Sequence, residues 1–232
     1  MSPVFREERP LGNYAVRESL ARNLAERAAA ALGLAVLAPL LAAIAVAVVL
    51  EDGFPVFYLQ DRMGRGGNTF SLRKFRSMRH RSSGTLVTAK GDSRITRIGA
   101  FLRKMKLDEL PQLWNVVRGD MALIGPRPEV PHYVEYGDPR WKAVLSVRPG
   151  ITDLATLVYR DEEEILARAE DPESCYRSEV LPRKLALNLE YLEERSVASD
   201  LRLLALTARY SFLPDGFRSE EIRRQVMGEA RR

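Results

Sequence analysis

Two adjacent acids stand between a basic segment and a proline, at a point where a helix is expected to begin. The acids are Asp108 and Glu109, and the proline is Pro111. Proline is favoured at the first position of a helix, so both carboxylates are expected near that helix's N-terminal end. Three cations precede the pair closely: Arg103, Lys104 and Lys106. Acids and cations that converge at a helix N-terminus suit a site for phosphate together with a divalent metal.

A further cation lies in a short proline-rich loop. Arg127 has Pro126 and Pro128 on either side, which restricts the backbone and presents the guanidinium in a fixed place. Each feature also has an ordinary structural explanation. Acids near a helix start stabilise the helix dipole by ~0.3–1 kcal/mol, and an arginine in such a loop often forms a structural salt bridge. The phosphate-site interpretation therefore depends on the acids and cations occurring together.

The composition limits the classes of protein to consider. The chain has 232 residues, enough for one catalytic domain with attached helices. Hydrophobic residues make up 46% and charged residues 29%, which excludes a largely disordered chain. The formal net charge of +5 is compatible with phosphates, anionic lipids or nucleic acid as partners. One cysteine and two histidines exclude an internal disulfide and argue against a Cys/His zinc site.

Residues 28–50 form an apolar run of 23 residues without a charged side chain. A straight helix over this run would be ~34 Å long, enough to cross a hydrocarbon core of ~30 Å. A buried core helix is the alternative, although core helices rarely lack polar residues on every face. Pro39 lies near the middle and predicts a kink. Arginines flank the run on both sides, which under the positive-inside rule indicates two cytoplasmic ends. From these residues alone, a re-entrant helix and a spanning helix both remain open.

Shorter elements are expected after the apolar run. Two β-like runs at 56–59 and 69–72, separated by turn-forming residues, predict a β-hairpin. Helices are predicted over 95–106, from Pro111 to a stop at Gly119, and over 162–170, 181–194 and 200–210. The last two are amphipathic and suit either packing on the domain or contact with the membrane surface. Loops are predicted over 81–93 and 121–131, a turn at 148–150, and a charged, frayed tail from Phe217.

The order of these features resembles that of one family, the bacterial sugar transferases. The resemblance is to the monotopic phosphoglycosyl transferases, which begin cell-surface glycan assembly on a polyprenyl phosphate. It covers about residues 24–210 and rests on an ordered series of motifs. They are the apolar helix with its central proline, Lys74-Phe75-Arg76-Ser77-Met78, Thr96-Arg97-Ile98-Gly99, Leu107-Asp108-Glu109-Leu110-Pro111-Gln112-Leu113-Trp114-Asn115-Val116, Gly119-Asp120-Met121, Leu123-Ile124-Gly125-Pro126-Arg127-Pro128-Glu129 and Arg148-Pro149-Gly150-Ile151-Thr152.

The resemblance implies a ping-pong reaction. Asp108 would attack the β-phosphorus of a UDP-sugar, release UMP and form an aspartyl phosphosugar, which a polyprenyl (undecaprenyl) phosphate would then attack. An aspartate of ordinary pKa, ~3.9, is ionised at neutral pH and needs no general base for the first step. By the same resemblance Glu109 is the second catalytic residue and the ligand of a Mg²⁺ cofactor. Substrate contacts are implied for Arg103, Arg127, Arg160 and Lys74.

The implied fold is α+β. It comprises a re-entrant membrane helix, a small β-hairpin and a mostly helical cytoplasmic catalytic domain with amphipathic interfacial helices. The expected division is a juxtamembrane segment at 1–27, the membrane helix at 28–50 with its break at Pro39, a catalytic domain at 51–213 and a charged tail at 214–232. The protein is expected at the cytoplasmic face of a bacterial inner membrane. Its expected partners are a UDP-sugar and a polyprenyl phosphate, without nucleic acid, and a homo-oligomer is compatible with the sequence.

The sequence departs from the family pattern at two places. Ala38-Pro39 replaces the Ser-Pro pair at which the family's helix breaks, so the hydroxyl that would bond a freed carbonyl is absent. Asp153-Leu154-Ala155-Thr156 replaces Gly-Trp-Ala-Gln, which points to a different sugar or nucleotide pocket. Two other functions stay under consideration. One is a basic, membrane-anchored binding or assembly module without catalysis, and the other is a lipid-linked transferase that uses direct attack.

Overall fold

The computed structural model describes residues 19–79, 87–89, 91–212 and 219–228 of the chain. Most of the predicted loop at 81–93 lies outside these residues, as do the first 18 residues of the predicted juxtamembrane segment. The described part is mostly helical and contains two small sheets of two strands each. The α+β class predicted from the sequence is therefore confirmed.

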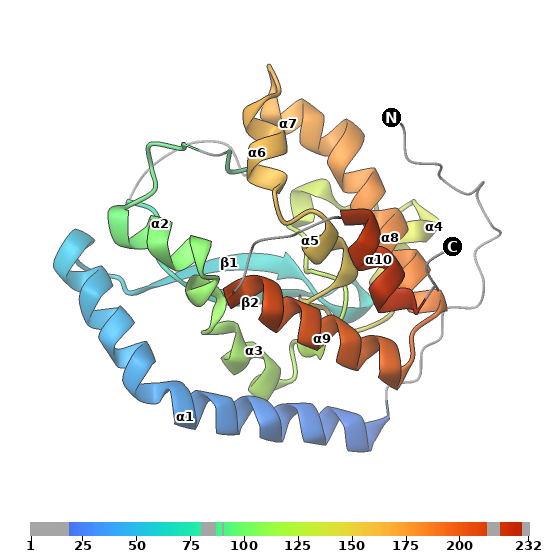
Figure 1. The fold of residues 1–232 in the computed structure, drawn as a ribbon, viewed down its shortest axis with the longest axis horizontal. Coiled ribbons are helices and arrows are strands. Elements are labelled where there is room, and N and C mark those ends of the chain that lie inside the picture. Colours follow the sequence, from blue (N-terminus) through green and yellow to red (C-terminus); the bar gives the residue numbers. More distant parts are fainter. Residues whose placement is uncertain (1–18, 80–86, 90, 213–218, 229–232) are drawn as a thin grey trace.

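The longest element is α1 (Leu20–Asp52), a helix of 33 residues that forms one side of the molecule (Figure 1). It is long and apolar enough to cross a membrane by length and composition. The helix begins eight residues before the predicted apolar run, within the segment expected to be juxtamembrane. It continues through Pro39 without interruption and is visibly bent in Figure 1, as a proline inside a helix predicts. Pro39 therefore bends the helix rather than ending it.

One narrow face of α1 packs on the rest of the protein. Ala30 packs beside Val116 of the helix that follows the acid pair, whereas Ile44 and Val48 pack farther along α1. Most of the remaining apolar surface is exposed. The large exposed side chains include Leu32, Val36, Val46 and Leu50. Such a continuous exposed apolar surface is costly in water, which favours contact with lipid.

The predicted hairpin is confirmed, with strands longer than expected. Strand β1 (Phe57–Met63) pairs antiparallel with β2 (Thr69–Phe75), and a short 3-10 turn at Arg65–Gly67 connects them. The strands extend beyond the expected runs because their polar residues still take part in the ladder, as in the pairs of Tyr58 with Lys74 and Leu59 with Arg73. The hairpin thereby carries Lys74 toward the acid pair.

The segment around the acid pair folds as predicted in outline. Helix α2 (Arg97–Lys104) ends early, and a 3-10 turn, Leu107–Glu109, holds the two acids. Helix α3 (Gln112–Arg118) follows Pro111 and ends at Gly119, whose φ of 89° provides the left-handed cap that favours glycine. The acids therefore lie in the turn between two short helices.

The proline-rich segment at 121–131 is not a loop throughout, so that prediction is wrong for its first part. Residues Ala122–Ile124 form β3, which pairs in parallel with β4 (Gly150–Thr152). A Cβ atom on Gly150 would lie 2.1 Å from the Gly125 nitrogen, so the close approach of the two backbones requires glycine. Strands of three residues joined across 25 intervening positions leave no periodic pattern in the sequence.

Helices make up most of the described C-terminal half of the chain (Figure 1). The helices predicted at 162–170, 181–194 and 200–210 are present, whereas several short ones were not expected. The bounds are η3 (Pro131–Tyr133), α4 (Pro139–Val144), α5 (Leu154–Val158), α6 (Glu162–Ala167), α7 (Pro172–Cys175), a π-helical turn η4 (Tyr176–Val180), α8 (Leu181–Glu193), α9 (Val197–Phe212) and α10 (Ser219–Met227).

The prediction of a frayed tail is wrong for residues 219–227. Helix α10 places Ile222 and Val226 in a buried cluster with Leu203 of α9. A short charged helix of this kind escapes detection because only two of its positions are apolar anchors. Helix α9 remains amphipathic, since Leu203 is fully buried and Leu201 is exposed. Contact of its exposed leucines, Leu201 and Leu204, with a membrane surface stays a prediction.

Candidate active site

The acid pair is held by a short strained turn. Lys106 adopts a left-handed backbone conformation with φ of 56°, which is uncommon for a residue other than glycine. The 3-10 turn that follows places Asp108 and Glu109 before α3. Asp108 is 5% exposed, so it lies inside the protein rather than on its surface. The turn therefore presents one of the two acids to a buried environment, next to several cations.

Glu109 is held by two cations from distant parts of the chain. Its Oε1 accepts hydrogen bonds from Arg127 at 2.6 Å and from Lys74 at 3.3 Å, and its Oε2 accepts one from Arg127 at 3.1 Å. Burial opposes ionisation of Glu109, but the charges of Arg127 and Lys74 outweigh it and hold the pKa of Glu109 well below its ordinary value. Burial also lowers the pKa of Lys74 to about 8, against the attraction of Glu109. Glu109 is therefore a fixed anion.

Asp108 is in a different state from its neighbour. Its Oδ1 atom is buried and has no hydrogen-bond partner among the described side chains and backbone groups. Burial raises the pKa of Asp108, and the charge of Glu109 adds to the effect, while Lys74, Arg103 and Lys106 oppose it. The expectation of an ordinary pKa for Asp108 is therefore wrong, because the sequence alone does not show that the carboxylate is buried. A carboxylate oxygen without hydrogen bonds is a more reactive nucleophile than one that is fully bonded.

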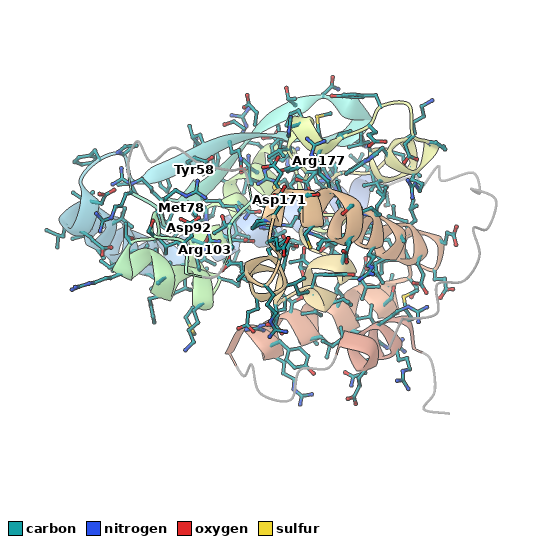
Figure 2. The ribbon with its side chains drawn as sticks, turned by 90° about the horizontal axis from the view of Figure 1, so that it is seen from above. Tyr58, Met78, Asp92, Arg103, Asp171 and Arg177 are labelled. Atoms are coloured by element: carbon teal, nitrogen blue, oxygen red, sulfur yellow. The ribbon has the colours of Figure 1, made fainter. Side chains whose placement is uncertain are left out.

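The structure gathers most of the predicted site residues. Lys74 and Arg127 contact Glu109 directly, whereas the charge of Arg103 acts on Asp108 from α2. Arg103 projects from α2 in Figure 2 and forms an ion pair with Glu163 at the start of α6. Its Nε atom is buried and has no partner within the described residues. The three cations Lys74, Arg103 and Arg127, together with Asp108 and Glu109, are referred to below as the acid–cation centre.

Arg160 has no described contact with the acid–cation centre. Its guanidinium donates to the backbone carbonyl oxygen of Tyr210, near the end of α9. No described contact connects it with either acid. The role implied for Arg160 in nucleotide contact stays a prediction, while its observed contact joins the segment after α5 to α9.

Sequence reasoning missed a buried amide that aligns the site. Asn115 on α3 is 2% exposed. Its Oδ1 accepts from the Arg73 backbone nitrogen at 3.1 Å, and its Nδ2 donates to the Ser71 carbonyl at 2.8 Å. Both bonds fix α3 to β2 next to Lys74, which keeps Lys74 and Glu109 in register. A polar residue facing the core of a short helix was the available signal, since such groups are generally hydrogen-bonded when buried.

The residues present fit a magnesium ion that is shared with substrate phosphates. No group of three or more His, Cys, Asp or Glu side chains converges within the described residues, so a cage made by the protein alone is not present there. Mg²⁺ commonly takes one or two carboxylates, with phosphates and waters supplying its other ligands. The Glu109 carboxylate, which its lowered pKa keeps ionised, provides one such protein donor.

The fold and the site together define a class: an α+β domain with a long apolar helix and an acid–cation centre suited to phosphates. Comparison with known proteins gives the family. The bacterial sugar transferase profile matches residues 17–213, and the chain belongs to this family.

Three relatives illustrate the similarity. A putative undecaprenyl-phosphate N-acetylgalactosaminyl 1-phosphate transferase of Bacillus subtilis is 44% identical over 130 residues, which cover 53% of this chain and 73% of the relative. A UDP-glucose:undecaprenyl-phosphate glucose-1-phosphate transferase of Caulobacter vibrioides is 36% identical, covering 85% of this chain and 71% of the relative. A protein of the same name from Xanthomonas campestris is 37% identical over 84% of this chain, but the match spans only 39% of that relative's length.

Proposed function

We propose that this protein transfers a sugar phosphate from a UDP-sugar to undecaprenyl phosphate and releases UMP. The relatives support the reaction class, since those from Caulobacter vibrioides and Xanthomonas campestris are named for this transfer with UDP-glucose. The observation that carries the proposal is the unbonded Oδ1 of Asp108, buried beside the cations of the acid–cation centre. An oxygen of this kind is unfavourable for stability and useful for nucleophilic attack.

The reaction would proceed in two displacements at one phosphorus atom. In the first, Asp108 Oδ1 forms a bond to the β-phosphorus of the UDP-sugar. The bond between that phosphorus and the bridging oxygen breaks, and UMP leaves with the bridging oxygen. In the second, an oxygen of the lipid phosphate attacks the same phosphorus and displaces the Asp108 carboxylate. The products are lipid diphosphosugar and the regenerated carboxylate.

The cations reduce the main obstacle, which is repulsion between a carboxylate and a dianionic pyrophosphate. Arg127 and Lys74 already form one cationic cradle around Glu109. Arg127 carries a planar fork of donors that matches phosphate oxygens, and it can bond phosphate while one of its nitrogens stays on Glu109. The charge of Arg103 acts on Asp108, and its buried Nε has no partner among the described residues. These fixed charges stabilise the negative charge on the departing UMP.

Magnesium is proposed as the cofactor, with Glu109 as its protein ligand. When bound, Mg²⁺ would neutralise pyrophosphate oxygens and stabilise the leaving group. Glu109 suits that task because its low pKa keeps it ionised across the working range of pH. In the described structure its two oxygens face Arg127 and Lys74, so metal binding requires those contacts to be shared with phosphate oxygens.

The membrane arrangement is part of the proposal. The exposed apolar surface of α1 would enter the bilayer, and its bend at Pro39 would return the helix to the same face. The catalytic domain would then lie on the cytoplasmic side, where UDP-sugars are available. The acid pair would lie near the surface of the membrane, where a lipid phosphate is presented.

The direct test is a screen of UDP-sugars with undecaprenyl phosphate in detergent or vesicles, with UMP release as the readout. Release is expected for at least one sugar, and it should be lost in Asp108→Asn and after removal of Mg²⁺ with a chelator. Absence of UMP release with every UDP-sugar would favour a non-enzymatic binding module. Undiminished turnover by Asp108→Asn would favour direct attack of the lipid phosphate, without a covalent intermediate.

A further inference from the structure

The loop that carries Arg127 has few backbone N–H donors. Pro126 and Pro128 have no backbone N–H, so Gly125 and Arg127 supply the only two N–H donors of the segment 125–128. The Gly125 nitrogen donates to the Thr152 carbonyl at 3.1 Å. The Arg127 nitrogen donates to a side chain, the Oδ2 of Asp153, at 3.0 Å. The carbonyls of Pro126 and Pro128 also accept hydrogen bonds, from the Gly150 nitrogen at 3.0 Å and Arg62 Nη1 at 3.1 Å. The backbone nitrogen of Arg127 itself is held by one carboxylate oxygen.

Asp153 is built into this position. It is 0% exposed, and it directly follows β4, which pairs with β3 ahead of the Arg127 loop. Its Oδ1 accepts from the Thr156 nitrogen at 2.7 Å and caps helix α5. One oxygen of the carboxylate therefore accepts a hydrogen bond at the start of α5, and the other accepts one from the Arg127 backbone. The different sugar or nucleotide pocket expected from the changed segment 153–156 stays a prediction.

We propose that Asp153 is a positioning residue for the transfer reaction, which fixes the Arg127 guanidinium beside Glu109 by holding the Arg127 backbone nitrogen. The proposal rests on the proposed function and extends it to a residue outside the acid–cation centre. A buried carboxylate between a helix start and a loop cation also restrains the loop electrostatically, since it attracts the Arg127 charge. A small displacement of a substrate-contacting group, of about 1 Å, is sufficient to lower a rate about 100-fold.

The first test compares two aspartates that cap helices. Asp153→Asn keeps the shape of the side chain but provides one carbonyl oxygen for two N–H donors. Asp138→Asn is the matched control, since Asp138 caps α4 through the Arg140 nitrogen at 2.8 Å and belongs to no part of the site. We expect Asp153→Asn to lower kcat for UMP release about 10- to 100-fold, and Asp138→Asn to leave kcat within about twofold. A kcat for Asp153→Asn within twofold of the wild-type value would overturn the proposal.

The second test separates positioning from a general effect on folding. Asp153→Asn and Arg127→Ala are measured singly and together, with thermal unfolding recorded for each. If Asp153 acts through Arg127, the Asn substitution will have little further effect on kcat once the guanidinium is gone. Additive losses in the double variant would contradict this. Should Asp153→Asn not fold, Asp153→Ser is used, because serine also caps helices but does not extend to the Arg127 nitrogen. If the wild-type protein releases no UMP, the proposed function is refuted, and the role of Asp153 is refuted with it. If only the Asp153 tests fail, the proposed function stands.

Discussion

Two buried groups of charges in this protein differ in one respect that explains their roles. The first is the acid–cation centre around Asp108 and Glu109. The second, here termed the anchor cluster, joins the start of α1 to the helical domain and consists of Arg22, Glu26, Arg148, Arg195 and Asp200. In the anchor cluster, Arg148 contacts Glu26 Oε2 at 3.1 Å, Arg22 contacts Glu26 Oε1 at 2.9 Å, and Arg195 contacts Asp200 at 3.2 Å.

The acids of the anchor cluster are fully engaged. Both oxygens of Glu26 are bonded to arginines, and Asp200 also accepts a hydrogen bond from the Tyr191 hydroxyl. In the acid–cation centre Glu109 is engaged in the same way, but Asp108 keeps a buried oxygen without a partner. Paired charges hold helices in place. A buried carboxylate oxygen without a partner lowers stability but remains able to react. The comparison supports the proposal that Asp108, rather than the most strongly bonded acid, is the nucleophile.

The largest effect is expected at Asp108. Asp108→Asn should lower the rate of UMP release by at least about 10⁴-fold, as expected for loss of a nucleophile. The same change should stabilise the fold, because an amide is less costly than a carboxylate in a buried site without full hydrogen bonding. A rise in Tm of about 2–4 °C, which corresponds to ~1 kcal/mol, should appear in thermal unfolding in detergent. A lower Tm would show that the carboxylate is satisfied after all.

The second effect concerns the anchor cluster. Arg148→Met removes one of the two arginines that contact Glu26, and removal of one member of a buried pair costs roughly 3–5 kcal/mol. We expect a marked fall in Tm, with residual folded protein still active. Arg118→Met is the control, since Arg118 is largely exposed and its ion pair with Asp120 contributes little. Equal changes in Tm for the two variants would mean that the anchor cluster does not stabilise the fold.

A smaller loss is expected for one cation of the acid–cation centre. Lys74→Met removes a charged hydrogen bond to Glu109 while Arg127 remains. A charge-assisted contact is worth ~1.5–3 kcal/mol, so kcat/KM for the UDP-sugar should fall about 10- to 100-fold. Lys142→Met on α4, which alters an exposed lysine, should leave kcat/KM unchanged. An unaltered kcat/KM in Lys74→Met would remove Lys74 from the site.

The smallest effect is expected at an ion pair on the surface. The Arg140 hydrogen bond lowers the pKa of Asp138, so the stability that it contributes is present above the ordinary aspartate pKa and is lost as pH falls below it. Asp138→Asn should therefore lower stability by about 0.5 kcal/mol or less near pH 7, and by a smaller amount near pH 2. Urea unfolding at both values of pH measures the difference. A difference that grows as the pH falls would reverse the assigned sign.

Much of this organisation could be predicted from the sequence, because the signals are local. The apolar run, the hairpin, and the acids before Pro111 each appear as a contiguous pattern, and each is present in the structure. Strands β3 and β4 could not be predicted, since they pair only through a contact between distant segments. The raised pKa of Asp108 and the hydrogen bond that Asp153 accepts from the Arg127 nitrogen both depend on what surrounds each carboxylate. Such surroundings come from tertiary packing, which no pattern of residue types specifies.

The most direct test of the central claim is the intact mass of the purified protein after incubation with Mg²⁺ and an active UDP-sugar, without lipid phosphate. Attack by Asp108 predicts an increase equal to one sugar phosphate, which disappears when undecaprenyl phosphate is added and never forms in Asp108→Asn. An unchanged mass in a preparation that does release UMP once lipid is present would contradict a covalent role for this carboxylate.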